Sequence, residues 1–170
     1  MYYGHMVRNP NKGHALDTTD RRILDLVQRD ATMAQAAIAR KVGLSTAAVN
    51  ERLRKLRATG TIRRIAALVD PAALGATVTA FVEVFLDHPR YEPAFLDRAV
   101  KLPEVLECHH ITGEFSLLLK VRVASMESLR DLLLRQLGGH QGVRQTRTVM
   151  VLSTVKEETY VASASEGDRS

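Results

Sequence analysis

The sequence has 170 residues, with 24 Lys and Arg against 19 Asp and Glu, and 45% of its residues are hydrophobic. This length allows one large domain or two small ones, with enough apolar residues for a globular core. No apolar run approaches a membrane span, and the N-terminus lacks the apolar region of a secretory signal. Cys108 is the only cysteine, which excludes an internal disulfide and a thiolate zinc site. We therefore expect a cytoplasmic protein without membrane contact.

The charge is distributed unevenly along the chain. Residues 1–70 contain 13 basic and 6 acidic side chains, whereas residues 71–170 contain 11 basic and 13 acidic ones. A basic first half joined to a slightly acidic second half predicts that only the first half meets a polyanion.

Residues 1–14 are polar and show no periodicity, which predicts a flexible arm. His5 and His14 lie there without the spacing of metal ligands, so we expect no metal site. Asp17 has the character of an N-cap and Asp20 would occupy position N3, predicting a helix to about Arg29. A second helix is expected from about residue 33 to residue 41.

The next stretch predicts a helix-turn-helix. Gly43 can adopt the positive φ that ends a short helix, and Ser45 is a good N-cap for the helix that follows. In that helix Val49, Leu53 and Leu56 form one apolar stripe at positions i, i+4 and i+7. The opposite face carries small, Asn and Arg side chains, as expected for a helix in a major groove.

After Gly60 a basic two-stranded wing is predicted, which completes a winged helix-turn-helix over residues 15–70. The alternative is a solvated basic helix face, but turn, stripe and basic ribbon together favour double-stranded DNA as the partner. We predict Ala47, Asn50 and Arg54 as base readers. The other predicted DNA-binding residues, which include the helix start and the phosphate contacts, are Ser45, Thr46, Arg52, Lys55, Arg57, Arg63 and Arg64.

Residues 71–76 form the predicted hinge, since Pro71 stops strand pairing and Gly75 offers a bend. Beyond it the pattern alternates. A strand is expected at 77–86, a helix at 91–101, strands at 105–111 and 115–123, a helix capped by Ser125, and a strand at 146–155. The order β-α-β-β-α-β predicts a ferredoxin-like plait over residues 77–160 and a frayed tail at 161–170. The predicted fold class is α+β. The first strand has apolar groups on both sides, which calls for a covering partner.

From Leu16 to about Lys156 the chain resembles the Lrp/AsnC family of bacterial and archaeal transcriptional regulators. The motifs that carry the resemblance are Leu16-Asp17 with Asp20, Val42-Gly43-Leu44-Ser45, Gly60-Thr61-Ile62, Pro103-Glu104-Val105, Thr112-Gly113-Glu114, Leu118-Leu119-Lys120-Val121 and Gly142-Val143. Each motif is weak alone, but their order and spacing over some 140 residues are specific.

The resemblance implies a DNA-binding regulator whose plait binds an effector, commonly an amino acid, and builds homodimers that assemble into larger rings such as octamers. Carried over by position, the effector residues are Thr112, Gly113, Glu114 and Ser116, with Thr146 and Thr148 from the last strand. The family's turn often ends in Asp where this chain has Ser116, so a free amino acid would lose one ion partner for its ammonium group. Glu114 is the available substitute.

Two other functions are open at this stage. An architectural, nucleoid-type protein would wrap DNA without an effector. An enzyme is conceivable because siroheme decarboxylases resemble the same two-domain arrangement and use histidines. However, His109 and His110 are successive strand residues that point to opposite faces. We therefore expect no catalytic residue and no cofactor, with Cys108 as a small hydrophobic residue.

Overall fold

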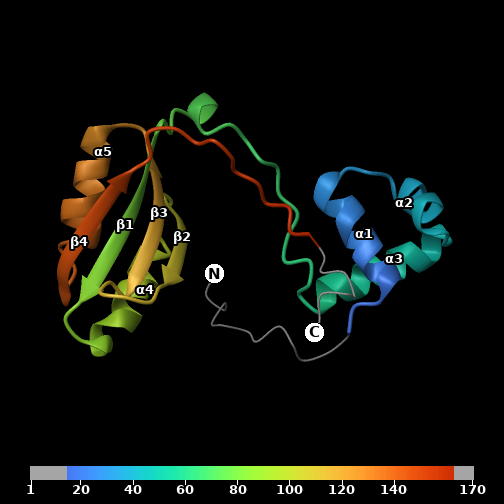
Figure 1. Ribbon diagram of the computed structural model, residues 1–170, viewed down its shortest axis with the longest axis horizontal. Helices are drawn as coiled ribbons and strands as arrows, with labels where there is room; N and C mark the ends of the chain where they lie inside the picture. Colours follow the sequence, from blue (N-terminus) through green and yellow to red (C-terminus); the bar gives the residue numbers. More distant parts are fainter. Residues whose placement is uncertain (1–14, 163–170) are drawn as a thin grey trace. The chain divides into compact units, whose positions relative to one another are not determined.

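The computed structural model describes residues 15–162 and divides into two compact units (Figure 1). Of the described residues, the first unit contains 15–67 and 157–162, and the second contains Leu68–Lys156. The predicted arm at 1–14 and the tail beyond 162 lie outside the described residues. The second domain was expected to extend to residue 160, but residues 157–162 group with the first unit. None of the helices in residues 15–162 has the length and apolar character of a membrane span.

The first unit is built on three helices, α1 (Thr18–Arg29), α2 (Gln35–Val42) and α3 (Thr46–Ala58). α1 begins with a capping box, in which the side chains of Asp17 and Asp20 each accept a hydrogen bond from the other residue's amide. All three helices contribute to one small apolar core. Its buried residues are Ile23, Ile38, Ala39, Val49, Leu53 and Leu56.

The predicted two-stranded wing is not formed within this chain. Residues 61–70 contain no strand, although Ile62 packs against the helical core and its amide donates to the Leu56 carbonyl. Beyond Ile62 the side chains are exposed, with Leu68 at 77%. A ladder needs hydrogen bonds to a neighbouring strand, and residues 61–70 are in no sheet. The three-helix arrangement of the predicted winged helix-turn-helix is confirmed, whereas the prediction of a paired two-stranded ribbon is wrong for residues 61–70.

The second unit is a four-stranded antiparallel sheet in the order β2-β3-β1-β4. Its strands are β1 (Val78–Leu86), β2 (Val105–His110), β3 (Leu117–Val123) and β4 (Val143–Met150). The helices α4 (Glu92–Ala99) and α5 (Met126–Asp131), the latter continued by the π-helical η3 (Leu132–Leu137), lie on one face (Figure 1). Short 3₁₀ turns, η1 (Ala72–Leu74) and η2 (Pro89–Tyr91), complete it. This is the predicted plait.

The core of this unit lies between the sheet and its helices. Alternate residues of β1 and β3 are fully buried, as the strand period requires, and Phe95, Leu129 and Leu137 pack on them. The opposite face of β1, with Phe81 and Phe85, is only half-buried in the single chain. That face therefore retains apolar surface, consistent with the expected covering partner.

β4 runs from residue 143 to residue 150 rather than from 146 to 155. Gly142, with φ +89°, ends the preceding turn and lets Val143 pair with Leu86 across a bulge. At the other end the Val151 amide donates to the Thr79 carbonyl. β1 begins at Val78, so the residues after Val151 have no strand to pair with. The expected boundary was wrong because the partner strand, not the apolar pattern, sets it.

Candidate DNA-binding face and ligand site

The turn before α3 fixes which face of the helix points outward. Gly43 has φ +72°, the left-handed conformation that closes α2, and the Ser45 hydroxyl accepts a 3.2 Å hydrogen bond from the Ala48 amide. Val49, Leu53 and Leu56 are buried, as predicted. The outer face of α3 is therefore presented by a helix fixed at its start and along its inner side.

The predicted base readers lie on this outer face. Ala47 and Asn50 are exposed, and the Arg54 side chain is 69% exposed. The Arg54 guanidinium donates two hydrogen bonds, of 2.9 and 2.7 Å, to the Glu51 carboxylate. These bonds lower the pKa of Glu51. Surface ion pairs contribute little free energy, so Arg54 can leave Glu51 and bind a base or a phosphate at little energetic cost.

Arg52 has a different environment from the one predicted. Its guanidinium bonds to the Asp17 carboxylate at 2.6 Å and to the Asp20 carboxylate at 2.7 Å. The Asp20 side chain is 3% exposed, against 31% for Arg52. Arg52 thus joins α3 to the first turn of α1. This geometry indicates a residue that positions α3, and the phosphate contact of Arg52 stays a prediction.

Several predicted phosphate contacts are exposed. Arg57, Arg63 and Arg64 make no ion pair within residues 15–162, and Lys55 lies 3.8 Å from the Glu51 carboxylate. The exposed pair Arg40 and Lys41 in the last turn of α2 was missed by sequence reasoning. The sequence could have indicated these two cations, since they lie just before the turn at Gly43. Thr46, the first residue of α3, is also exposed.

The predicted effector residues gather at one end of the sheet. Thr112, Gly113 and Glu114 are exposed in the turn between β2 and β3, with Gly113 at φ +121°. The Ser116 amide donates to the Val84 carbonyl, and Thr146 of β4 pairs with the same Val84 from the other side. The turn and Thr146 therefore flank one residue of β1, while Thr148 lies further along, opposite Val82.

A charged and aromatic cluster beside this turn was not predicted. Arg147 pairs with Glu83 across the β1–β4 ladder, and its guanidinium lies 4.9 Å from the centre of the Phe115 ring. The bond between Arg147 and Glu83 lowers the pKa of Glu83 and raises the pKa of Arg147, with a smaller contribution from Glu114 to the latter. The cluster needs the register between β1 and β4, which sequence patterns alone do not supply.

The two neighbouring histidines contact different partners. His109 lies 3.1 Å from Glu107 and His110 lies 3.0 Å from Glu92 of α4. Burial raises the pKa of the half-buried Cys108 thiol, with a smaller contribution from Glu92. Within residues 15–162, no three His, Cys, Asp or Glu side chains are grouped to hold a metal ion.

Comparison with known families matches both units. Residues 16–63 match the winged helix-turn-helix DNA-binding model, and residues 79–161 match the Lrp/AsnC ligand-binding domain. The chain is 38% identical to the leucine-responsive regulatory protein of Escherichia coli K12, over 85% of this chain and 90% of that protein. It is 35% identical to the transcriptional regulator FL11 of Pyrococcus horikoshii, over 85% and 94%.

Solved structures agree with these relatives. A transcriptional regulator from Neisseria meningitidis, in complex with L-Met, is similar with a TM-score of 0.81 and 30% identity, over 86% of this chain and 96% of that one. AsnC of Escherichia coli is similar with a TM-score of 0.80 and 28% identity, over 86% of this chain and 99% of that one. These relatives are regulators rather than enzymes, as expected. The chain belongs to the Lrp/AsnC family of DNA-binding transcriptional regulators.

Proposed function

We propose that this regulator recognises specific DNA sites as a homo-oligomer and that an amino acid bound at the plait tunes this binding. The observation that carries the proposal is the outer face of α3. Asn50 and the exposed Arg54 lie on a helix whose inner face is buried and whose start is capped. Asn pairs with adenine and Arg with guanine in the major groove. Arg57, Arg63 and Arg64 then serve as phosphate contacts.

The effector part of the proposal is supported by the end of the sheet described above. The turn at Thr112–Ser116 and the start of β4 offer backbone amides, hydroxyls and both signs of charge. Backbone amides around Gly113 suit a carboxylate, and Glu114 or Glu83 suits an ammonium group in place of the missing Asp at Ser116. The similar Neisseria regulator was crystallised with L-Met, so an amino acid is the first class to test.

The experiment is a thermal-shift screen against the twenty amino acids at millimolar concentration, with the oligomer mass measured before and after. A ligand that raises the melting temperature in wild type and loses its effect in Glu114→Ala supports the proposed site. If none of the twenty amino acids changes the melting temperature, the proposal of an amino-acid effector is contradicted. The proposal of DNA binding is then tested separately.

An effector-independent architectural protein is the second candidate, favoured by the Ser116 substitution. Sequence preference separates the two functions. A regulator binds one duplex far more tightly than unrelated DNA at a fixed salt concentration, whereas an architectural protein binds them about equally.

A further inference from the structure

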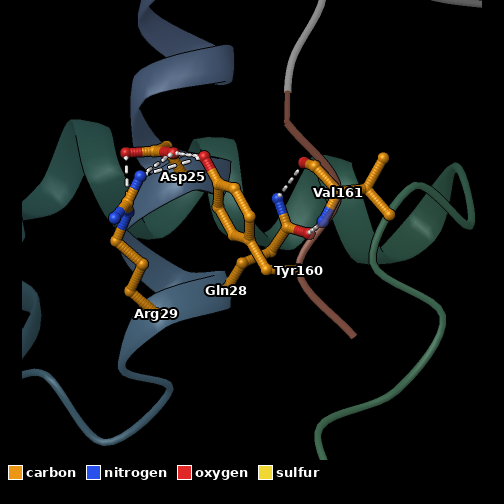
Figure 2. A network of polar contacts seen from close by, with 5 residues as sticks. All are labelled: Asp25, Gln28, Arg29, Tyr160 and Val161. Carbon is orange, nitrogen blue, oxygen red and sulfur yellow. Dashed lines mark hydrogen bonds and ion pairs between the residues drawn. The ribbon is translucent and has the colours of Figure 1, made fainter. Parts of the chain in front are cut away.

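The end of the described chain is attached to the first helix of the DNA-binding unit. Figure 2 shows residues of α1 and of the C-terminal segment in one polar network. The Tyr160 hydroxyl donates to the Asp25 carboxylate, and the Arg29 guanidinium lies 4.7 Å from the centre of the Tyr160 ring. Arg29 also donates to the Tyr160 oxygen at 3.1 Å. The aromatic ring and its hydroxyl are thus both engaged by α1.

The next residue is held through its backbone. The Gln28 amide group donates to the Val161 carbonyl at 3.1 Å and accepts from the Val161 amide at 2.9 Å. One side-chain amide thus bonds both the N–H and the C=O group of Val161, as a neighbouring strand would. Both bonds form only when the backbone of Val161 is held at one position relative to Gln28. The Tyr160 bond also lowers the pKa of Asp25. Two adjacent residues therefore make independent contacts with the same helix.

We propose that residues 157–161 are a C-terminal clamp that restrains the DNA-binding unit and that Tyr160 is its positioning residue. The unit is then connected to the plait twice, through residues 63–77 and through residues 151–159. The inference rests on the proposed function, in which two DNA-binding units of a dimer bind one operator.

The two connections differ in length, which gives the clamp its effect. About ten residues separate Met150, the end of β4, from Tyr160, so this connection spans at most ~35 Å. About sixteen residues separate Ile62, the last residue packed on the helical core, from Val78, the start of β1, so the connection before β1 spans at most ~55 Å. Releasing the clamp lengthens the reach by about one half and enlarges the accessible volume roughly fourfold.

The clamp consequently matters for paired sites rather than for single ones. When one unit of a dimer is bound, the local concentration of the second unit falls as its accessible volume grows. Affinity for a single half-site depends on the DNA contacts of one unit and is unaffected. Because β4 also carries Thr146 and Thr148, a ligand at the plait acts on the strand that leads directly into the clamp.

The test compares full-length wild type with Tyr160→Ala, and with Gln28→Ala on the opposite side of the contact. Thr159→Ala, at an exposed position in the same segment, is the matched control. Duplexes selected by wild type from a random pool are used with both half-sites or shortened to one. We expect both clamp variants to lose about three- to fivefold in affinity for the two-half-site duplex and less than twofold for the single half-site. Tyr160→Phe, which keeps the ring beneath Arg29, should lie between.

Hydrogen exchange measured by mass spectrometry provides a readout that does not need DNA. Amides of residues 157–161 should exchange faster in Tyr160→Ala than in wild type or Thr159→Ala. An equal loss on both duplexes, or no loss on either, would overturn the positioning role. If wild type selects no preferred duplex, the proposed function fails, and unchanged exchange in Tyr160→Ala then refutes the clamp itself.

Discussion

At the scale of single residues, two arginines two positions apart on α3 have contrasting environments. Arg52 reaches Asp17 and the buried Asp20, whereas Arg54 lies exposed beside Glu51. Composition and spacing do not distinguish them, since both are cations near the edge of the same helix face. The distinction depends on where α1 packs.

Arg52→Ala and Arg54→Ala should therefore give crossed phenotypes. Removing Arg52 deprives the buried Asp20 of an ion partner and should lower the free energy of unfolding by about 1–3 kcal/mol. Removing Arg54 should leave the free energy of unfolding nearly unchanged but weaken binding to a selected operator by about 1–3 kcal/mol. Urea unfolding and DNA titration measure both quantities. If Arg52→Ala unfolds like wild type, the positioning role is wrong.

The capping carboxylate predicts how acid acts on the helical unit. The Asp20 amide and then Arg52 hold the pKa of Asp17 below its ordinary value. A carboxyl whose folded pKa is depressed contributes stability above its unfolded pKa, about 3.9, and loses it as pH falls through the folded pKa. Asp17→Asn keeps a capping oxygen but cannot ionise.

We expect Asp17→Asn to be less stable than wild type near pH 7, with the difference shrinking as pH falls below about 4. Melting temperatures measured from pH 7 to pH 2.5 follow this convergence. A constant difference across that range would show that Asp17 does not titrate with folding.

At the scale of elements, the sequence predicted what local chemistry dictates. The capping box, the Gly43 turn, the Ser45 cap and the alternating strands all follow from side chains within a few residues. Three other features depend on contacts with segments distant in the sequence. They are the pairing of the wing, the end of β4 and the unit to which residues 157–162 belong. The candidate sites divide in the same way, because Asn50 and Arg54 follow from helix periodicity, whereas the Glu83–Arg147 pair follows from strand register.

Gly142 at the start of β4 provides a test of local packing. A Cβ at this position would lie 2.2 Å from the Tyr91 ring, and φ is +89°. Gly142→Ala should therefore lower the stability of the plait by about 2–4 kcal/mol, from overlap and backbone strain together. Gly75→Ala, at φ +76° with open space around it, is the control for strain alone and should cost about 1 kcal/mol. Chemical denaturation measures the free energy of unfolding of both variants. Equal decreases in this free energy would mean that the Tyr91 ring moves aside in Gly142→Ala.

At the scale of the whole molecule, charge separates the two units. The basic residues concentrate before residue 70, and the exposed Arg57, Arg63 and Arg64 lie there. The side of the plait is slightly acidic, with 11 basic and 13 acidic side chains after residue 70. We therefore expect electrostatic attraction to DNA at the first unit rather than at the second.

Arg63→Ala should weaken binding to all duplexes alike, because a phosphate contact carries no sequence information. The slope of log affinity against log salt should fall by about 1. Titrations of selected and unrelated duplexes at several salt concentrations give both values, with Arg54→Ala as the comparison that loses preference. Loss of preference in Arg63→Ala would reassign it as a base reader.

The attachment of residues 157–162 to α1 also has a consequence for biosynthesis. Domains generally form in the order in which the ribosome releases them. The three helices emerge first, the sheet follows, and Tyr160 emerges only after every strand has been made. A nascent chain thus holds its DNA-binding helices on a single connection until translation has passed the ligand domain. The restraint on the DNA-binding helices therefore forms only after residues 157–161 have left the ribosome.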